Sequence, residues 1–196
     1  MIGLHPCSVD KKFDEELREM ETWIDREKFY AVGEIGIDLY WDKTYIAEQR
    51  IAFKSQIQLA EKNHLPIVIH MRNAFDEVME VLLETKPKGI KGIFHCFSGT
   101  PEQAKQIIEK TGFKLGIGGV ITFKNSNLSK VIETIDLEHI VLETDAPYLA
   151  PHPYRGKRNE SSYITLIAGK VAEIKNLNIE RVAEITTNNS KEIFGV

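Results

Sequence analysis

Short apolar runs alternate with longer segments of helical periodicity along the whole chain. The apolar runs begin near Ile2, Tyr30, Pro66, Ile90, Phe113 and His139. Continuous apolar runs of this length are typical of parallel strands that are buried on both faces. Helices are expected at residues 11–27, 44–63 and 74–85, after Thr100, and at residues 127–135, 161–175 and 179–194. The pattern therefore predicts an α/β protein with parallel strands.

Capping signals support these helix boundaries. Asn73 is expected to cap the helix at 74–85, since asparagine is a good N-cap residue. Thr100 is followed by Pro101 and, at the third position, by Gln103, which together predict a capping box. Four residues are expected to end helices: Asn63, Gly112, Asn176 and Gly195.

Six predicted strands allow two architectures. One is an open doubly wound sheet, and the other is a TIM-type (β/α)8 barrel that is incomplete, with about six βα units present and the first two missing. An open sheet usually concentrates its site at one switch point, whereas here most strand ends carry a polar group. The distribution of these groups therefore favours the incomplete barrel, as a single domain over residues 1–196.

Ionisable residues follow four of the apolar runs. Glu34, His70, His95 and Asp145 stand where separate strands are expected to end. Burying so many ionisable groups is unfavourable unless they are paired or bound to metal. Because the carboxyl ends of barrel strands converge on one rim, these four residues are candidate ligands for divalent cations. Glu34 and Asp145 are also the candidate catalytic residues.

Other residues near these positions are candidates for substrate binding. His5 ends the first apolar run, and Arg72 follows His70 by two residues, where its guanidinium could clamp a phosphate. The segment 152–160 combines basic and aromatic residues, a composition that suits a phosphodiester chain, and it contains Arg158 and Asn159. Glu143 is interpreted as an interior acid and Cys96 as a packing residue.

Composition narrows the class of protein. The net charge of −4 gives no global basic field, although a local patch is enough for a nucleic-acid site. Two cysteines imply no disulfide framework. No apolar stretch is long enough to span a membrane and no signal peptide is visible, so we expect a cytoplasmic protein.

The ordered motifs resemble those of the TatD family of metal-dependent DNases. They are GLHP, GEIGID, PIVIHMR, HCFSG, GIGG, ETDAPYL and RGKRNE. The resemblance implies a barrel of the amidohydrolase-like kind that hydrolyses DNA phosphodiester bonds, typically by trimming ends. It also implies that Glu34 is shared by two metal ions, that His70 and His95 complete one site, and that Asp145 belongs to the other. His5 and Arg72 would lie at the substrate end of the pocket.

The chain departs from the family pattern at its start. The family begins with a strand bearing a His-x-His pair and a second βα unit, and neither precedes GLHP here. Up to two ions (Mg, Mn, Zn or Ni) are expected in a complete barrel, and open sheet edges predict self-association. Two alternatives remain open, namely an amidohydrolase acting on a C–N or lactone bond, and an impaired fragment that only binds metal or a partner.

Overall fold

The structure, a computed structural model, describes residues 1–196 as two compact units, Met1–His95 and Cys96–Val196. The first unit contains the 3-10 helix η1 (Pro6–Ser8), α1 (Phe13–Ile24), β1 (Val32–Asp38), α2 (Ile46–Lys62), β2 (Ile67–Arg72), α3 (Phe75–Thr85) and β3 (Gly92–Phe94). The second unit contains α4 (Pro101–Thr111), β4 (Lys114–Ile117), η2 (Gly119–Thr122), α5 (Leu128–Thr134), η3 (Leu137–His139), β5 (Ile140–Leu142), η4 (Ser161–Tyr163), α6 (Ile164–Lys175) and α7 (Ile179–Phe194).

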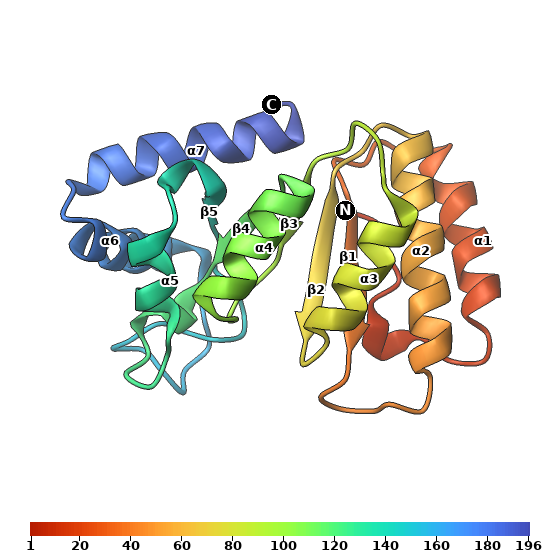
Figure 1. Cartoon of the computed structure of the whole chain (residues 1–196), viewed down its shortest axis with the longest axis horizontal. Coiled ribbons are helices and arrows are strands. Elements are labelled where there is room, and N and C mark those ends of the chain that lie inside the picture. Colours follow the sequence, from red (N-terminus) through yellow and green to blue (C-terminus); the bar gives the residue numbers. More distant parts are fainter. The chain divides into compact units, whose positions relative to one another are not determined.

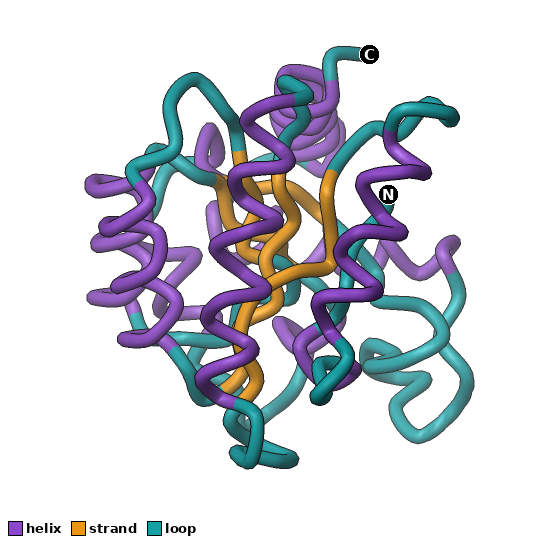
Figure 2. The backbone as a smooth tube through the Cα atoms, turned by 90° about the vertical axis from the view of Figure 1, so that its right-hand side faces the viewer, coloured by secondary structure: helices purple, strands orange, loops and turns teal.

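All strand pairs within the two units are parallel, as the alternating pattern predicted. In the first unit β1 pairs with β2 and β2 with β3, and in the second unit β4 pairs with β5. Each parallel pair is joined by a helical crossover, because parallel neighbours cannot be linked by a tight hairpin. Helices α1, α2 and α3 lie side by side along β1 and β2 (Figure 1). Figure 2 looks onto this helical layer, with strands behind it.

The first predicted strand, at residues 2–4, is reduced to a single bridge. Ile2 pairs in parallel with Val32, and no further residue of the segment joins the ladder. The backbone N–H and C=O of Leu4 bond instead to the side-chain amide of Gln56 on α2, at 2.7 and 3.2 Å. The expectation of six strands was therefore wrong by one, because a buried glutamine replaces the strand partner of Leu4.

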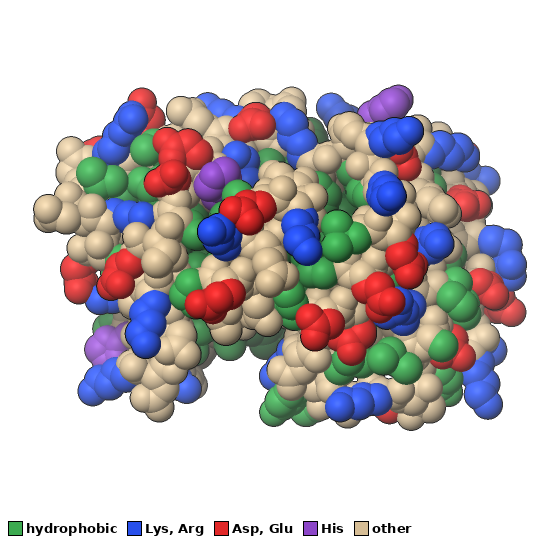
Figure 3. Space-filling model, viewed as in Figure 1, with side chains coloured by type: hydrophobic (Ala, Val, Ile, Leu, Met, Phe, Trp, Pro, Cys, Tyr) green, Lys and Arg blue, Asp and Glu red, His purple; other side chains and the backbone are tan.

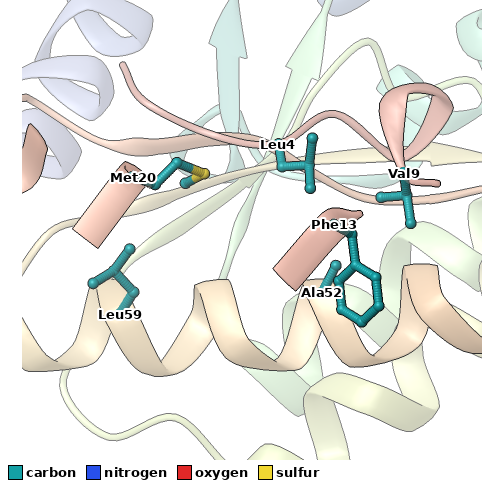
Figure 4. Close-up of a cluster of buried hydrophobic side chains, with 6 residues drawn as sticks. All are labelled: Leu4, Val9, Phe13, Met20, Ala52 and Leu59. Atoms are coloured by element: carbon teal, nitrogen blue, oxygen red, sulfur yellow. The ribbon is translucent and has the colours of Figure 1, made fainter. Parts of the chain in front are cut away.

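A hydrophobic cluster fixes this N-terminal segment against the helices. Six buried side chains from the segment, α1 and α2 form it: Leu4, Val9, Phe13, Met20, Ala52 and Leu59 (Figure 4). Phe13 and Met20 lie on the buried face of α1, seven residues apart, as helical periodicity requires. Burial of such apolar side chains is the main stabilising term in folding. The cluster thereby holds the chain on both sides of His5.

Most helix boundaries agree with the capping signals. Thr100 and Gln103 form the predicted capping box, and α7 spans the predicted residues. Asn63, Gly112, Asn176 and Gly195 occupy the C-cap positions of their helices. The prediction for Asn73 was wrong, because the N-cap of α3 is Ala74 and Asn73 adopts a left-handed φ of 53°.

Charged side chains of both signs are interspersed over the face drawn in Figure 3. This surface agrees with the small net charge of −4. None of the helices combines the length and the apolar character needed to cross a membrane.

Candidate metal centre

Glu34 lies at an irregularity inside β1. The pairing of β1 with β2 passes from Gly33 opposite Val68 to Ile35 opposite Ile69, so Glu34 is an extra residue with no partner. The strand was expected to end near Glu34, but it continues to Asp38. Bulges of this kind often occur beside active sites, where they redirect a side chain. The irregularity therefore sets Glu34 apart from the hydrogen-bonded ladder.

Three imidazoles surround one oxygen of the Glu34 carboxylate. Oε2 lies 3.8 Å from His5 Nε2, 3.8 Å from His70 Nδ1 and 3.7 Å from His95 Nε2. The side chains are partly exposed, from 11% for His95 to 35% for His5. The structure thus brings together the three predicted ligands of the first unit, and it places His5 among them.

Strand register explains why these residues meet. His70 lies within β2, opposite Gly36 of β1, and His95 directly follows β3. The His95 N–H donates to the carbonyl of Ile69, 2.9 Å away, which sets His95 beside His70. Gly36 has a φ of 144°, and a Cβ there would overlap the His70 carbonyl oxygen. Only glycine allows β1 to approach His70 this closely.

Asp38 fixes the orientation of His70. Its Oδ2 lies 2.8 Å from His70 Nε2, and its side chain is only 2% exposed. Burial alone would raise the pKa of Asp38, but hydrogen bonds from His70 and from the backbone of Tyr40 and Trp41 outweigh it and lower this pKa. An ionised carboxylate can only accept, so His70 carries its proton on Nε2 and directs the Nδ1 lone pair toward Glu34.

His5 completes a consistent chain of hydrogen bonds. Its Nδ1 accepts from the backbone N–H of Cys7 at 3.1 Å, which assigns its ring proton to Nε2. His5 Nε2 lies 3.2 Å from the Nδ1 of His70 and can donate to it. From Asp38 to Cys7, each donor therefore faces an acceptor.

The ionisation of the cluster suits a cation. Desolvation, together with the His70 ring, lowers the pKa of His5 below 6.5. The neighbouring His70 lowers the pKa of Glu34 against the opposing effect of burial, and His95 and His5 lower it further. Neutral imidazoles and ionised carboxylates are the forms that bind metal.

The donor set fits a divalent metal ion. Ligand atoms of His5, Glu34 and His70 lie within 4.8 Å of one another. Of these, Glu34 and the Nδ1 of His70 offer lone pairs in the assigned tautomers, whereas His5 Nε2 carries a proton and serves as a hydrogen-bond donor. His95 adds a further imidazole nitrogen at a similar distance from Glu34. Imidazole and carboxylate ligands suit Zn, Mn or Ni, among other ions. Cys7 is not suited to ligation, because desolvation and the nearby Asp38 raise the pKa of its thiol to about 11.

Arg72 lies at the outer edge of this centre. It pairs in register with Asp38, and its side chain is exposed. The guanidinium carbon lies 3.9 Å from the centroid of the Tyr40 ring and 5.2 Å from that of Trp41. The structure therefore places Arg72 on an aromatic pair that the sequence analysis did not assign to the site.

The remaining predicted residues belong to the second unit. Asp145 lies in a turn after β5, with a φ of 56°, and its carbonyl accepts from the N–H of Tyr148. Asn159 is 2% exposed, and its Nδ2 donates to the carbonyls of Thr144 and Tyr148 at 2.5 and 2.6 Å. Asn159 thus holds the turn that carries Asp145, while Arg158 is exposed. Substrate contact by these two residues stays a prediction.

Glu143, interpreted from the sequence as an interior acid, takes part in a hydrogen bond within the second unit. It follows β5, is half-buried, and its Oε1 accepts the backbone N–H of Cys96. This bond helps to hold the start of the second unit against β5. The basic segment that follows packs partly on aromatic rings, with Arg155 4.3 Å from the Phe123 centroid.

Three structural residues carried weak sequence signals. Asp38 ends the GEIGID motif and is followed by two aromatic residues, but its hydrogen-bond partners are set by strand register. Gln49 and Gln56 are seven residues apart on α2, so they share its buried face, where polar residues are uncommon. Each accepts a backbone N–H of this unit, from Asp38 and Leu4 respectively.

Comparison with known proteins finds similarity to metal-dependent hydrolases and to TatD proteins. An uncharacterized metal-dependent hydrolase of Bacillus subtilis, YabD, is 41% identical over 196 residues, which cover 100% of this chain and 76% of that protein. The crystal structure of the TatD homologue YjjV from Escherichia coli has a TM-score of 0.92 at 30% identity, covering 100% of this chain and 76% of YjjV. A TatD family hydrolase from Entamoeba histolytica has a TM-score of 0.80 at 27% identity, covering 99% and 73%.

A family model confirms the resemblance seen in the motifs. The model for TatD related DNase matches residues 1–195, which is nearly the whole chain. The motifs at Glu34, His70 and His95 therefore lie in the matched region together with the cluster they form. The chain belongs to the TatD related DNase family.

Proposed function

We propose that this chain is a metal-dependent hydrolase that cleaves phosphodiester bonds in DNA, by trimming from an end. The observation that carries the proposal is the convergence of three imidazole nitrogens on one oxygen of Glu34. Arg72, which is exposed and lies two residues from His70 on β2, favours a phosphate substrate over a neutral amide. The family description and the names of its relatives support hydrolysis that depends on a metal.

The residues of the first unit have distinct roles in this proposal. Glu34, His70 and His95 would hold a divalent cation, which would supply positive charge beside a phosphate oxygen and lower the pKa of bound water. Asp38 keeps the Nδ1 lone pair of His70 available by accepting a hydrogen bond from the Nε2–H of His70. Arg72 binds the phosphate and neutralises the charge that develops on its oxygens.

Asp145 is assigned the role of proton acceptor. The assignment rests on the ETDAPYL motif and on the turn that Asn159 holds through two hydrogen bonds. A carboxylate in a fixed turn can accept a proton from water without a large loss of conformational freedom. Arg158, on the same loop, is proposed to contact the DNA backbone.

The test is hydrolysis of a 3′-labelled single-stranded oligonucleotide by the full chain, with Mg, Mn or Zn and with EDTA. Cleavage should require metal and should be lost in Glu34→Gln and Asp145→Asn. The matched control is Glu84→Gln, which changes an exposed carboxylate on α3. Equal cleavage in EDTA, or by Glu34→Gln, would contradict the proposal.

Two further substrates separate the alternatives. A circular single strand has no ends, so end trimming predicts that it stays intact while the linear strand shortens. A cyclic amide tests the amidohydrolase alternative, and metal binding without hydrolysis of either substrate would identify a binding protein without turnover. An incomplete barrel that lacks two βα units stays a prediction. Self-association through sheet edges also stays a prediction, and sedimentation can test it.

A further inference from the structure

An exposed aromatic pair lies directly after β1. Tyr40 is 51% exposed and Trp41 is 70% exposed. Their rings meet edge to face, with centroids 4.8 Å apart and an interplanar angle of 88°. Arg72 lies over the Tyr40 ring. We call these three residues the aromatic platform.

The platform is held in a defined conformation. Asp38 Oδ1 accepts the backbone N–H groups of Tyr40 and Trp41, at 2.9 and 3.2 Å. The N–H of Asp38 is in turn bonded to Gln49, at 2.9 Å. Leu39 N–H donates to the carbonyl of Arg72, at 2.9 Å, which ties the turn to β2. The large exposed rings therefore stand on an ordered turn that buried groups support.

We propose that the aromatic platform is a stacking subsite for a nucleobase of single-stranded DNA. Every base offers a π-face to an aromatic ring or a guanidinium plane, so such a subsite tolerates any sequence. A guanidinium that lies on a ring keeps its in-plane N–H groups for a phosphate, which gives the platform both a stacking surface and a cation. This inference rests on the proposed function, since it names the part of the substrate that this edge of the centre recognises.

The aromatic platform and the metal centre share strand β2 and the side chain of Asp38. Arg72 is two residues from His70 on β2, and Asp38 contacts both His70 and the platform backbone. Other exposed aromatic side chains of the first unit lack this connection. Trp23, for example, is 46% exposed on α1 and bonds to Glu19 of the same helix.

The test compares binding of a fluorescein-labelled oligothymidylate and an abasic oligonucleotide of equal length, by anisotropy in EDTA. Trp41→Ala should weaken binding of the oligothymidylate by about 5- to 150-fold, the loss expected for one stacked base. Its binding of the abasic strand should not change. Trp41→Phe should retain most of the affinity, and Trp23→Ala should bind as the unaltered protein does.

Equal affinity of Trp41→Ala and the unaltered protein for the oligothymidylate would overturn the subsite. So would an equal loss for both strands, or no binding of DNA by the unaltered protein. Circular dichroism checks that the variants are folded. Base-dependent binding without metal-dependent cleavage would refute the proposed hydrolysis and leave the subsite standing. Cleavage without base-dependent binding would refute the subsite alone.

Discussion

Replacement of Asp38 by asparagine tests how the chain prepares His70 for a metal ion. Three donors converge on the Asp38 carboxylate, two backbone N–H groups on Oδ1 and His70 Nε2 on Oδ2. Asparagine has only one oxygen. If that oxygen stays with the backbone donors, the NH₂ group faces His70 and drives its proton from Nε2 to Nδ1.

On Nδ1 the proton would occupy the lone pair that faces Glu34 Oε2, 3.8 Å away, and that a metal ion would need. Nδ1 of His70 would face the Nε2 proton of His5, and His5 cannot reverse its own tautomer because its Nδ1 accepts from Cys7. Loss of a carboxylate that orients a ligating histidine typically weakens metal binding by about 10- to 100-fold. That loss corresponds to about 1.4–2.8 kcal/mol of binding free energy.

Titration calorimetry with Zn or Mn measures this change directly. Nitrogen-15 NMR of the imidazoles reports the tautomer of His70 in the metal-free protein. The matched control is Asp42→Asn in the following turn, which alters an exposed carboxylate that caps Thr44. Metal affinity within about twofold of the unaltered protein, with Asp38→Asn folded, would refute the reasoning.

Three other predictions concern stability. Gln56→Leu should lower the free energy of unfolding by about 2–4 kcal/mol in urea denaturation, because two buried backbone groups of Leu4 lose their partners; a change below about 0.5 kcal/mol would contradict this. Phe13→Ala, in the cluster of Figure 4, should cost about 3–5 kcal/mol in the same assay, and a negligible cost would show that the cluster does not anchor the segment. In EDTA, the melting temperature should fall as the pH drops below 6.5. Folding lowers the pKa of His5, so His5 binds a proton more readily in the unfolded chain than in the folded one, and acid favours unfolding. A second fall in melting temperature should begin below about pH 4.5, because Glu34 binds a proton there in the unfolded chain, whereas its lowered pKa keeps it ionised in the folded chain. His5→Asn should lack the first fall, and an unchanged profile would exclude His5 as its cause.

The sequence predicted the positions of helices better than it predicted which strands pair and in what register. Helix α7 and the Thr100 capping box follow from local rules of spacing and hydrogen bonding, which act within one turn of the chain. The strand expected at Ile2 depended on a distant side chain, Gln56, which no local pattern reveals. The position of Glu34 inside β1, rather than at its end, likewise depends on an irregular register with β2.

The candidate site shows the same division. Residue type and position after apolar runs were enough to select Glu34, His70 and His95 as candidate ligands, because burying ionisable groups at such places is unfavourable unless they are paired or bound to metal. The contribution of His5 to the cluster, and of Asp38 behind His70, required the three-dimensional register of β1 and β2. A carboxylate that acts through another residue has no distinctive sequence pattern of its own.

Asp38 would also couple the proposed binding of a cation to the proposed binding of a nucleobase. One of its oxygens orients His70 and the other supports the turn of Tyr40 and Trp41, so a shift of this single carboxylate alters both. Linkage requires that any factor by which a cation changes the affinity for an oligonucleotide equals the factor by which the oligonucleotide changes the affinity for the cation. If both proposals hold, this one carboxylate would let metal uptake respond to the presence of substrate without any larger movement of the chain.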